Sequence, residues 1–190
     1  NAHAENVAIA KSSLVGDGIV EFVPQGFDQT KTPSLILKEE PTAKGSVPSD
    51  WELYPQFTVV DGKANASLSL TGEISLYGGG EVTGPLLRNG QYIKLWNTDT
   101  GAYGVDGGKR LYQSHPWVLG VRRDGSAFGI LFDSSWKSEL HTNSDKIEFN
   151  TEGALFRIYI IDRESPKDVL KGLAELTGTC LLYTSPSPRD

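Results

Sequence analysis

Short apolar runs separated by polar residues make up most of the chain, from residue 19 to residue 161. Within these runs apolar residues recur at every second position, and Gly, Asp, Asn and Pro divide one run from the next. A period of two is typical of β-strands, whose side chains point alternately to two faces, and helical periodicity is absent here. The pattern predicts an all-β domain of antiparallel strands.

The clearest pair of predicted strands covers residues 117–122 and 127–132, on either side of an Asp-Gly turn. Asp124 and Gly125 suit the positive φ angles of a tight hairpin, so the two runs should pair. Large apolar side chains share a face on each strand, and together they predict one buried side. They are Trp117, Leu119 and Val121 on the first strand, and Phe128, Ile130 and Phe132 on the second.

Eight further runs are expected to form strands: 19–23, 34–37, 57–60, 66–70, 74–77, 93–96, 146–149 and 155–161. Residues 38–50, with prolines at 33, 41 and 48 nearby, read as a loop or an edge excursion. So many strands exceed one small open sheet, and no helices separate them. We therefore expect an antiparallel two-sheet β-sandwich, in which each sheet covers the apolar face of the other.

The pattern changes at Ser165, which suits a helix N-cap, with Pro166 in the first turn and Asp168 near the positive end of the dipole. Gly178 is a natural stop. Apolar residues recur between them at helical spacing: Val169, Leu170, Leu173 and Leu176. One C-terminal helix is therefore expected, which either connects to a further domain or docks onto its own sheet.

Residues 179–190 continue none of these patterns, and their Ser-Pro-Ser-Pro run predicts extended chain. This tail resembles translated sequencing adapter, so we expect it to be non-native and not to belong to the fold. The expected organisation is a β-sandwich over residues 1–164, a connector helix over 165–178 and a non-native tail over 179–190.

Charge and composition argue against several classes of partner. The formal net charge is -6 and no basic run exceeds two residues, so nucleic acid is not an expected partner. No stretch approaches the ~20 consecutive apolar residues of a membrane helix, so no membrane is expected either. Cys180 is the only cysteine, which rules out a disulfide within the chain.

A search for catalytic motifs yields little. The three histidines are scattered, and the chain lacks His-Glu-x-x-His, Cys-x-x-Cys and Gly-x-Ser-x-Gly. Gly78-Gly79-Gly80 precedes no Gly-Lys-Ser/Thr, so it indicates a backbone bend rather than a phosphate site. No catalytic residue, metal ligand or cofactor is therefore assigned within this chain.

One segment has the chemistry of a sugar site: Trp96-Asn97-Thr98-Asp99-Thr100. It follows a predicted strand and combines an aromatic ring, an amide, two hydroxyls and a carboxylate. Hydroxyls of a sugar bind amides and carboxylates, and its C–H face packs on an aromatic ring. The same residues also form ordinary turns at strand ends, and from this segment alone the turn is the stronger interpretation.

Six short phrases occur in a fixed order between residues 77 and 178. They are Tyr77-Gly78-Gly79-Gly80-Glu81, Trp96-Asn97-Thr98-Asp99-Thr100, Leu111-Tyr112-Gln113-Ser114-His115-Pro116, Gly125-Ser126-Ala127-Phe128-Gly129-Ile130-Leu131-Phe132, Ser165-Pro166-Lys167-Asp168-Val169-Leu170 and Leu176-Thr177-Gly178. In this order they resemble the N-terminal region of glycoside hydrolase family 31, the family of α-glucosidases and α-xylosidases.

The resemblance implies a galactose-mutarotase-like β-sandwich followed by a (β/α)8 barrel that carries both catalytic aspartates, and the barrel is missing from this chain. Asp99 matches the aspartate that hydrogen-bonds substrate from a loop reaching toward the active site. Asn97, Thr98 and Thr100 are its expected supports. The implied partners are an α-glucoside oligosaccharide and the catalytic barrel, and the chain by itself is expected to be inactive.

Three functions follow from this reading. The first is an accessory, substrate-rim domain of a retaining α-glucosidase-like hydrolase, with Asp99 at the rim. The second is a stand-alone carbohydrate-binding module, which would bind sugar measurably without any barrel. The third is a purely structural support domain, in which Asp99 only forms a turn.

Overall fold

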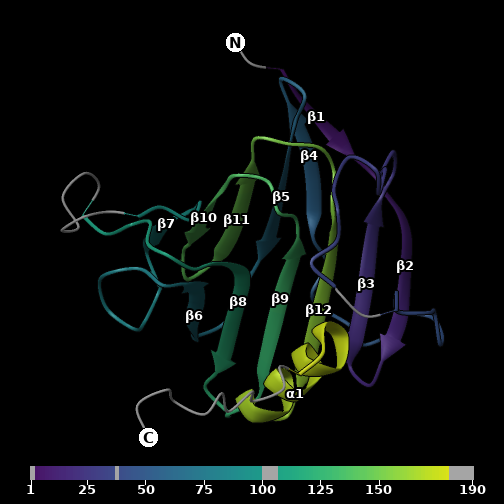
Figure 1. Ribbon diagram of the computed structural model, residues 1–190. Coiled ribbons are helices and arrows are strands. Elements are labelled where there is room, and N and C mark those ends of the chain that lie inside the picture. Colours follow the sequence, from purple (N-terminus) through teal and green to yellow (C-terminus); the bar gives the residue numbers. More distant parts are fainter. Residues whose placement is uncertain (1–2, 37–38, 100–106, 180–190) are drawn as a thin grey trace, which may run out of the picture.

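Two six-stranded antiparallel sheets face each other in the computed structural model, which describes residues 3–36, 39–99 and 107–179 (Figure 1). The first sheet has the order β1 (Ala4–Val7), β4 (Gln56–Val60), β5 (Lys63–Ser69), β11 (Lys146–Thr151), β10 (Ser138–Thr142) and β7 (Gln91–Leu95). The second has the order β2 (Ile9–Gly16), β3 (Ile19–Pro24), β12 (Arg157–Arg163), β9 (Ala127–Asp133), β8 (Ser114–Arg122) and β6 (Ile74–Gly80). The predicted two-sheet sandwich is confirmed.

The main core lies between the two sheets and is rich in phenylalanine. Phe132 from the second sheet stacks on Phe149 from the first, with ring centroids 4.5 Å apart, and Phe156 meets Phe149 edge-on at 5.2 Å. All three side chains are fully buried. Burying one such ring stabilises the fold by roughly 1.5–3 kcal/mol, so this cluster holds the two sheets together.

A second core covers the outer face of the second sheet. There the helix α1 (Pro166–Thr177) packs across β9 and β12, as Figure 1 shows in yellow. Apolar side chains of both sheet and helix form this core, among them Trp117, Leu131, Tyr159, Ile161, Val169 and Leu176. The helix thus docks onto its own sheet.

The ends of α1 follow the predicted signals. Ser165 Oγ accepts a hydrogen bond from the backbone N–H of Asp168 (3.2 Å), and the Gly178 N–H donates to the carbonyl of Ala174 (2.9 Å). Leu170, however, is 48% exposed, so it does not belong to the packed stripe. Gly172 is buried instead. It lies so close to β12 that a Cβ on it would be 2.9 Å from Ile161 Cγ2.

The predicted hairpin between residues 117 and 132 forms, but its predicted faces were wrong. Gly120 lies opposite Phe128, and Trp117 lies opposite Leu131. Phe128 therefore points into the main core, whereas Trp117 points to the outer face under the helix. A two-residue turn would have placed these rings on one side, and the observed register is shifted by one residue, which reverses the face.

The turn itself explains the shift. The Arg122 N–H donates to the Ser126 carbonyl (2.8 Å) and so closes a three-residue loop, in which only Gly125 has a positive φ (89°). By contrast, Asp61 and Gly62 between β4 and β5 both have positive φ, 50° and 76°, as a two-residue turn requires. Asp-Gly thus forms two different turns in one chain.

The predicted strand at 34–37 is wrong over residues 34–36, which form no strand, and Leu37 lies outside the described residues. The polar groups of this segment bond to Asp133 and not to a neighbouring strand. The Asp133 carboxylate accepts hydrogen bonds from Ser34 Oγ (2.7 Å) and from the Leu35 N–H (2.6 Å). Three of the described strands, β1, β2 and β10, were not predicted from the sequence. The first and last are rich in polar residues, so their apolar period is weak.

The structure tests some of the remaining predictions, and others fall on residues that it does not describe. Residues 39–50 form the predicted irregular stretch, apart from an isolated bridge between Gly45 and Leu14. Thr100 and residues 180–190 lie outside the described residues. Within the described part of the chain, no helix is long and apolar enough to cross a membrane, and no three His, Cys, Asp or Glu side chains gather as a metal site would require.

Candidate functional site

The segment after β7 leaves the first sheet at an edge strand and becomes exposed. Leu95 is buried as the last residue of β7, whereas Trp96 is 49% exposed. The backbone N–H of Thr98 donates to the carbonyl of Leu111 (2.9 Å), and Leu111 is itself buried. This bond anchors the exposed segment to the body of the domain.

Asp99 is exposed, and its side chain has a defined neighbour. The hydroxyl of Tyr112 donates to Asp99 Oδ1 (3.0 Å), and Tyr112 is itself 58% exposed. The bond directs Oδ1 of the carboxylate toward Tyr112, and solvent still reaches the side chain. Tyr112 belongs to one of the six phrases in the sequence, but nothing in the sequence alone assigns it to Asp99.

The predicted supports of Asp99 occupy different positions. Thr98 Oγ1 donates to the Trp96 carbonyl (3.1 Å), so this side chain closes a local turn at the strand end. Asn97 is exposed and lines a hollow beside Trp96. Thr100 is not among the described residues. Direct support of Asp99 by these three side chains stays a prediction.

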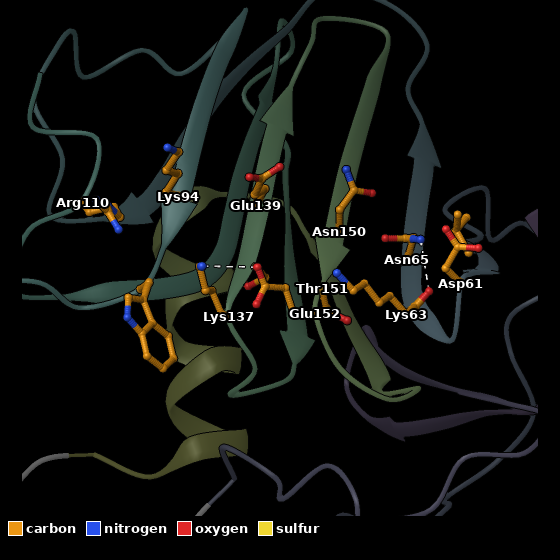
Figure 2. Close-up of a pocket in the computed structure, with 13 residues that line it drawn as sticks. Asp61, Lys63, Asn65, Lys94, Arg110, Lys137, Glu139, Asn150, Thr151 and Glu152 are labelled. Carbon is orange, nitrogen blue, oxygen red and sulfur yellow. Dashed lines mark hydrogen bonds and ion pairs between the residues drawn. The ribbon is translucent and has the colours of Figure 1, made fainter. Parts of the chain in front are cut away.

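Trp96 separates two hollows. The larger, about 500 Å³, lies on the outer face of the first sheet, and we call it the charged hollow (Figure 2). Basic and acidic side chains alternate along it: Lys63, Lys94, Arg110 and Lys137 against Asp61, Glu139 and Glu152. Figure 2 also shows Asn65 and Asn150 among them, and Lys137 lies 3.3 Å from Glu152. This is a solvated, polar sheet face.

Tyr92 on β7 contacts Glu139, one of the residues that line the charged hollow. Its hydroxyl donates to Glu139, and its ring lies against His141 with centroids 4.7 Å apart. Burial raises the pKa of Tyr92 to about 12, and the hydrogen bond to Glu139 adds to this rise. The hydroxyl therefore keeps its proton at neutral pH and remains a donor to Glu139.

The smaller hollow, about 380 Å³, lies between Trp96 and Trp136, and we call it the tryptophan hollow. Its lining combines two indoles with serine hydroxyls and an amide: Leu35, Leu95, Trp96, Asn97, Ser114, Pro116, Ser134, Ser135, Trp136 and Ser138. None of these described lining residues carries a formal charge. Trp96 and Asn97 belong to the segment with the chemistry of a sugar site, whereas Trp136 follows a different strand and was not predicted from the sequence.

A buried charge cluster lies beside this hollow. The guanidinium of Arg157 lies 3.5 Å from Asp133, 3.2 Å from Glu40 and 4.0 Å from Glu21. Tyr159 donates to Glu21 (2.7 Å), and burial, reinforced by this bond, raises the pKa of its hydroxyl. Because Asp133 also binds Ser34 and Leu35, the cluster fixes the segment that forms one wall of the tryptophan hollow.

Comparison with known proteins gives consistent relatives. The profile of the glycosyl hydrolase 31 N-terminal galactose mutarotase-like domain matches residues 13–140. The chain is 34% identical over 185 residues to alpha-glucosidase 2 of Bacillus thermoamyloliquefaciens, which covers 91% of this chain and 23% of that protein. It is 30% identical to the alpha-xylosidase XylQ of Lactiplantibacillus pentosus, covering 74% of this chain and 18% of that protein. The chain thus spans less than a quarter of either relative.

Solved structures of family 31 enzymes are also similar to this chain. A family 31 alpha-glucosidase from Bacteroides thetaiotaomicron is 69% identical over 63% of this chain and 20% of its own, with a TM-score of 0.58. A GH31 dextranase from Flavobacterium johnsoniae, 19% identical, superposes over 95% of this chain and 28% of its own with a TM-score of 0.71, which supports the fold. The chain therefore belongs to the glycoside hydrolase 31 N-terminal galactose-mutarotase-like domain family.

Proposed function

We propose that this chain is the N-terminal accessory and substrate-rim domain of a retaining α-glucosidase-like glycoside hydrolase. In this proposal residues 1–164 form the rim domain, residues 165–178 lead toward a catalytic (β/α)8 barrel, and residues 179–190 are foreign to the enzyme. Family membership supports the reaction class, since the relatives include α-glucosidases and an α-xylosidase. The chain alone would not hydrolyse glycosides, because both catalytic carboxylates lie on the barrel.

The observation that carries the proposal is the exposed carboxylate of Asp99, held by Tyr112 at the end of an anchored strand. A carboxylate accepts hydrogen bonds from sugar hydroxyls, and such charge-assisted bonds are short and strong. Holding it in one orientation before substrate arrives reduces the entropy lost on binding. Asp99 would thus position one glucoside hydroxyl while the barrel's nucleophile forms the glycosyl-enzyme and water resolves it.

Substitution of Asp99 in the full-length enzyme tests the proposal. Asp99→Ala should lower kcat/KM about 10- to 150-fold, because a hydrogen bond to a charged group is worth about 1.5–3 kcal/mol. Tyr112→Phe should have a smaller effect, since it leaves the carboxylate in place. Asp145→Ala, at another exposed aspartate, is the matched control and should leave kcat/KM unchanged.

The alternatives predict different results. Unchanged kcat/KM in Asp99→Ala would favour the structural support domain. A carbohydrate-binding module would bind oligosaccharide tightly without a barrel, whereas a rim domain contributes a few ligands and binds weakly. Titration of this chain with maltotriose, followed by NMR, separates the last two.

A further inference from the structure

Two of the chain's four tryptophans are exposed, and both line the same hollow. Trp96 is 49% exposed and Trp136 is 42% exposed, whereas Trp117 is only 9% exposed. The fourth, Trp51, is partly buried and donates its indole N–H to the Leu53 carbonyl (2.7 Å). Indoles left in water beside one another mark a surface that binds something.

Trp136 is fixed in place before any ligand arrives. Its indole N–H donates to the carbonyl of Lys31 (3.1 Å). A Cβ on Gly153 would lie 2.1 Å from ring atoms Cγ and Cδ2 and 2.4 Å from Cδ1, so the ring lies face-on over the glycine backbone. One face of the indole is therefore covered by Gly153, and the exposed remainder contributes to the hollow.

The part of the lining around Leu35 and Ser134 is also held by hydrogen bonds. Asp133 accepts hydrogen bonds from Ser34 Oγ (2.7 Å) and from the Leu35 N–H (2.6 Å), while Arg157 lies 3.5 Å from the same carboxylate. Asp133 immediately precedes Ser134, whose Oγ accepts from the backbone N–H of Trp136 (3.3 Å). A surface held in this way loses little conformational entropy when it binds a ligand.

The chemistry of the lining selects the ligand. Serine hydroxyls and the Asn97 amide offer neutral hydrogen-bond donors and acceptors, and the indoles offer flat apolar surface. The adjacent charged hollow has four basic and three acidic side chains, so the absence of formal charge from this lining is a local property. A neutral polyol ring, with hydroxyls at its edge and C–H groups on its face, matches both features. The volume of about 380 Å³ lies within the usual range for ligand pockets.

We infer that the tryptophan hollow is a subsite for a neutral pyranose unit of the oligosaccharide, packed against the indoles of Trp96 and Trp136. The inference rests on the proposed function, since Asn97 lines the hollow and Asp99 lies two residues further along the same exposed segment. The subsite binds a sugar unit other than the one that Asp99 contacts, and so it favours longer substrates over shorter ones.

Titration of the 190-residue chain with isomaltotriose tests the subsite directly, because each tryptophan gives one indole N–H signal in a ¹H–¹⁵N spectrum. The signals of Trp96 and Trp136 should shift and saturate in the millimolar range, while those of Trp51 and Trp117 stay in place. Trp136→Ala should abolish the saturable shift of Trp96, and Trp96→Ala should abolish that of Trp136. Leu170→Ala, which removes an apolar side chain of similar exposure elsewhere, should change neither.

Several outcomes would overturn the subsite. They are the absence of a saturable shift at Trp96 and Trp136, equal shifts at all four indoles, and a shift at either indole that survives loss of the other. If the two indoles are inaccessible to acrylamide in the full-length enzyme with and without sugar, the hollow is a contact between domains and the subsite is wrong.

The test is independent of the proposed role of Asp99. In the full-length enzyme, Trp136→Ala should lower kcat/KM several-fold more for a trisaccharide than for a disaccharide, whereas Asp99→Ala should lower both equally. Equal loss on both substrates in Trp136→Ala would contradict the subsite and leave the role of Asp99 intact. An inert Asp99→Ala would contradict the proposed function even where the indole signals shift.

Discussion

The outer faces of the two sheets differ in composition and in what covers them. On the second sheet, β12 is buried on both faces over Arg157–Ile161, and α1, Phe27, Leu35, Ile36 and Glu40 contribute to its cover. On the first sheet, β11 alternates buried and half-buried residues, and Lys94, Glu139, Asn150 and Asn65 lie side by side on neighbouring strands of the exposed face. The covered face stabilises the fold, while the exposed face is free to meet other molecules.

Two tryptophans differ in a similar way, since the ring of one is covered and the ring of the other is exposed. Trp117 lies over Gly129, where a Cβ would be 2.0 Å from ring atom Cη2, and Trp136 lies over Gly153 in a similar way. The ring of Trp117 is enclosed by the second core, whereas that of Trp136 stays open to solvent. The packing of an indole on a glycine therefore does not decide its role; what covers the other side of the ring does.

The largest effect should come from the covered tryptophan. Trp117→Ala leaves a cavity in the second core and should lower the free energy of unfolding by about 3–5 kcal/mol. Trp136→Ala removes a half-exposed ring and one hydrogen bond, and should cost about 1 kcal/mol. Urea denaturation followed by circular dichroism measures both. Equal losses would mean that the covered and the exposed indole contribute equally to stability.

Removal of a buried charge should have the next largest effect. Arg157→Ala leaves Asp133 and Glu21 buried without their cation and should cost about 3 kcal/mol, at the low end for buried pairs because Glu40 is half exposed. The matched control on the exposed face is Lys137→Ala, which breaks a solvent-exposed pair and should cost about 0–1 kcal/mol. The same denaturation series checks them, and a loss for Arg157→Ala no greater than for the control would contradict burial of the cluster.

Two leucines of α1 test how the helix covers the second sheet. Leu176→Ala should lower the free energy of unfolding by about 2 kcal/mol, because this side chain is buried in the second core. Leu170→Ala should change it by about 0.5 kcal/mol or less, since Leu170 is exposed. A larger loss at position 170 would mean that the helix packs through the stripe predicted from the sequence.

The smallest effect concerns pH at the start of α1. A hydrogen bond from the Ser165 hydroxyl, followed by one from Lys171, lowers the pKa of Asp168 below its ordinary value of 3.8. Because the pKa is lower in the folded state, this contribution to stability is present above pH 3.8 and is lost as the pH falls through the lowered value.

NMR titration of the Asp168 carboxyl measures that pKa. Ser165→Ala should return it toward 3.8, and Asp168→Asn should remove this part of the acid dependence altogether. A pKa that stays low in Ser165→Ala would show that the cap is not its main cause.

Much of the fold could be predicted because apolar alternation reports which face of a strand is buried. The pairing of 117–122 with 127–132 was predictable, but its register was not, since Asp-Gly is compatible with both two-residue and three-residue turns. The strand predicted at 34–37 is wrong over residues 34–36 because Ser34 and Leu35 bind a carboxylate 98 or more residues away, which no local pattern reports. β10 escaped notice because a single apolar residue, Leu140, faces the core.

The candidate site, like the fold, could be predicted only where its residues are neighbours in the sequence. Asn97, Thr98 and Asp99 were identifiable because they follow a strand and carry the chemistry of a sugar site. Tyr112 and Trp136 could not be connected with them, since Tyr112 follows an irregular stretch and Trp136 belongs to the loop before β10. A single sequence contains no signal for such contacts between distant segments.

The position of β12 in the second sheet has a consequence for synthesis of the chain. β12 lies between β3 and β9, and Tyr159 on it bonds to Glu21, 138 residues earlier. Until residues 157–163 have left the ribosome, β3 and β9 each present an unpaired edge that invites pairing with other chains. The second sheet therefore closes only after β12 has been synthesised, and a nascent chain that stalls before β12 is the form most exposed to aggregation.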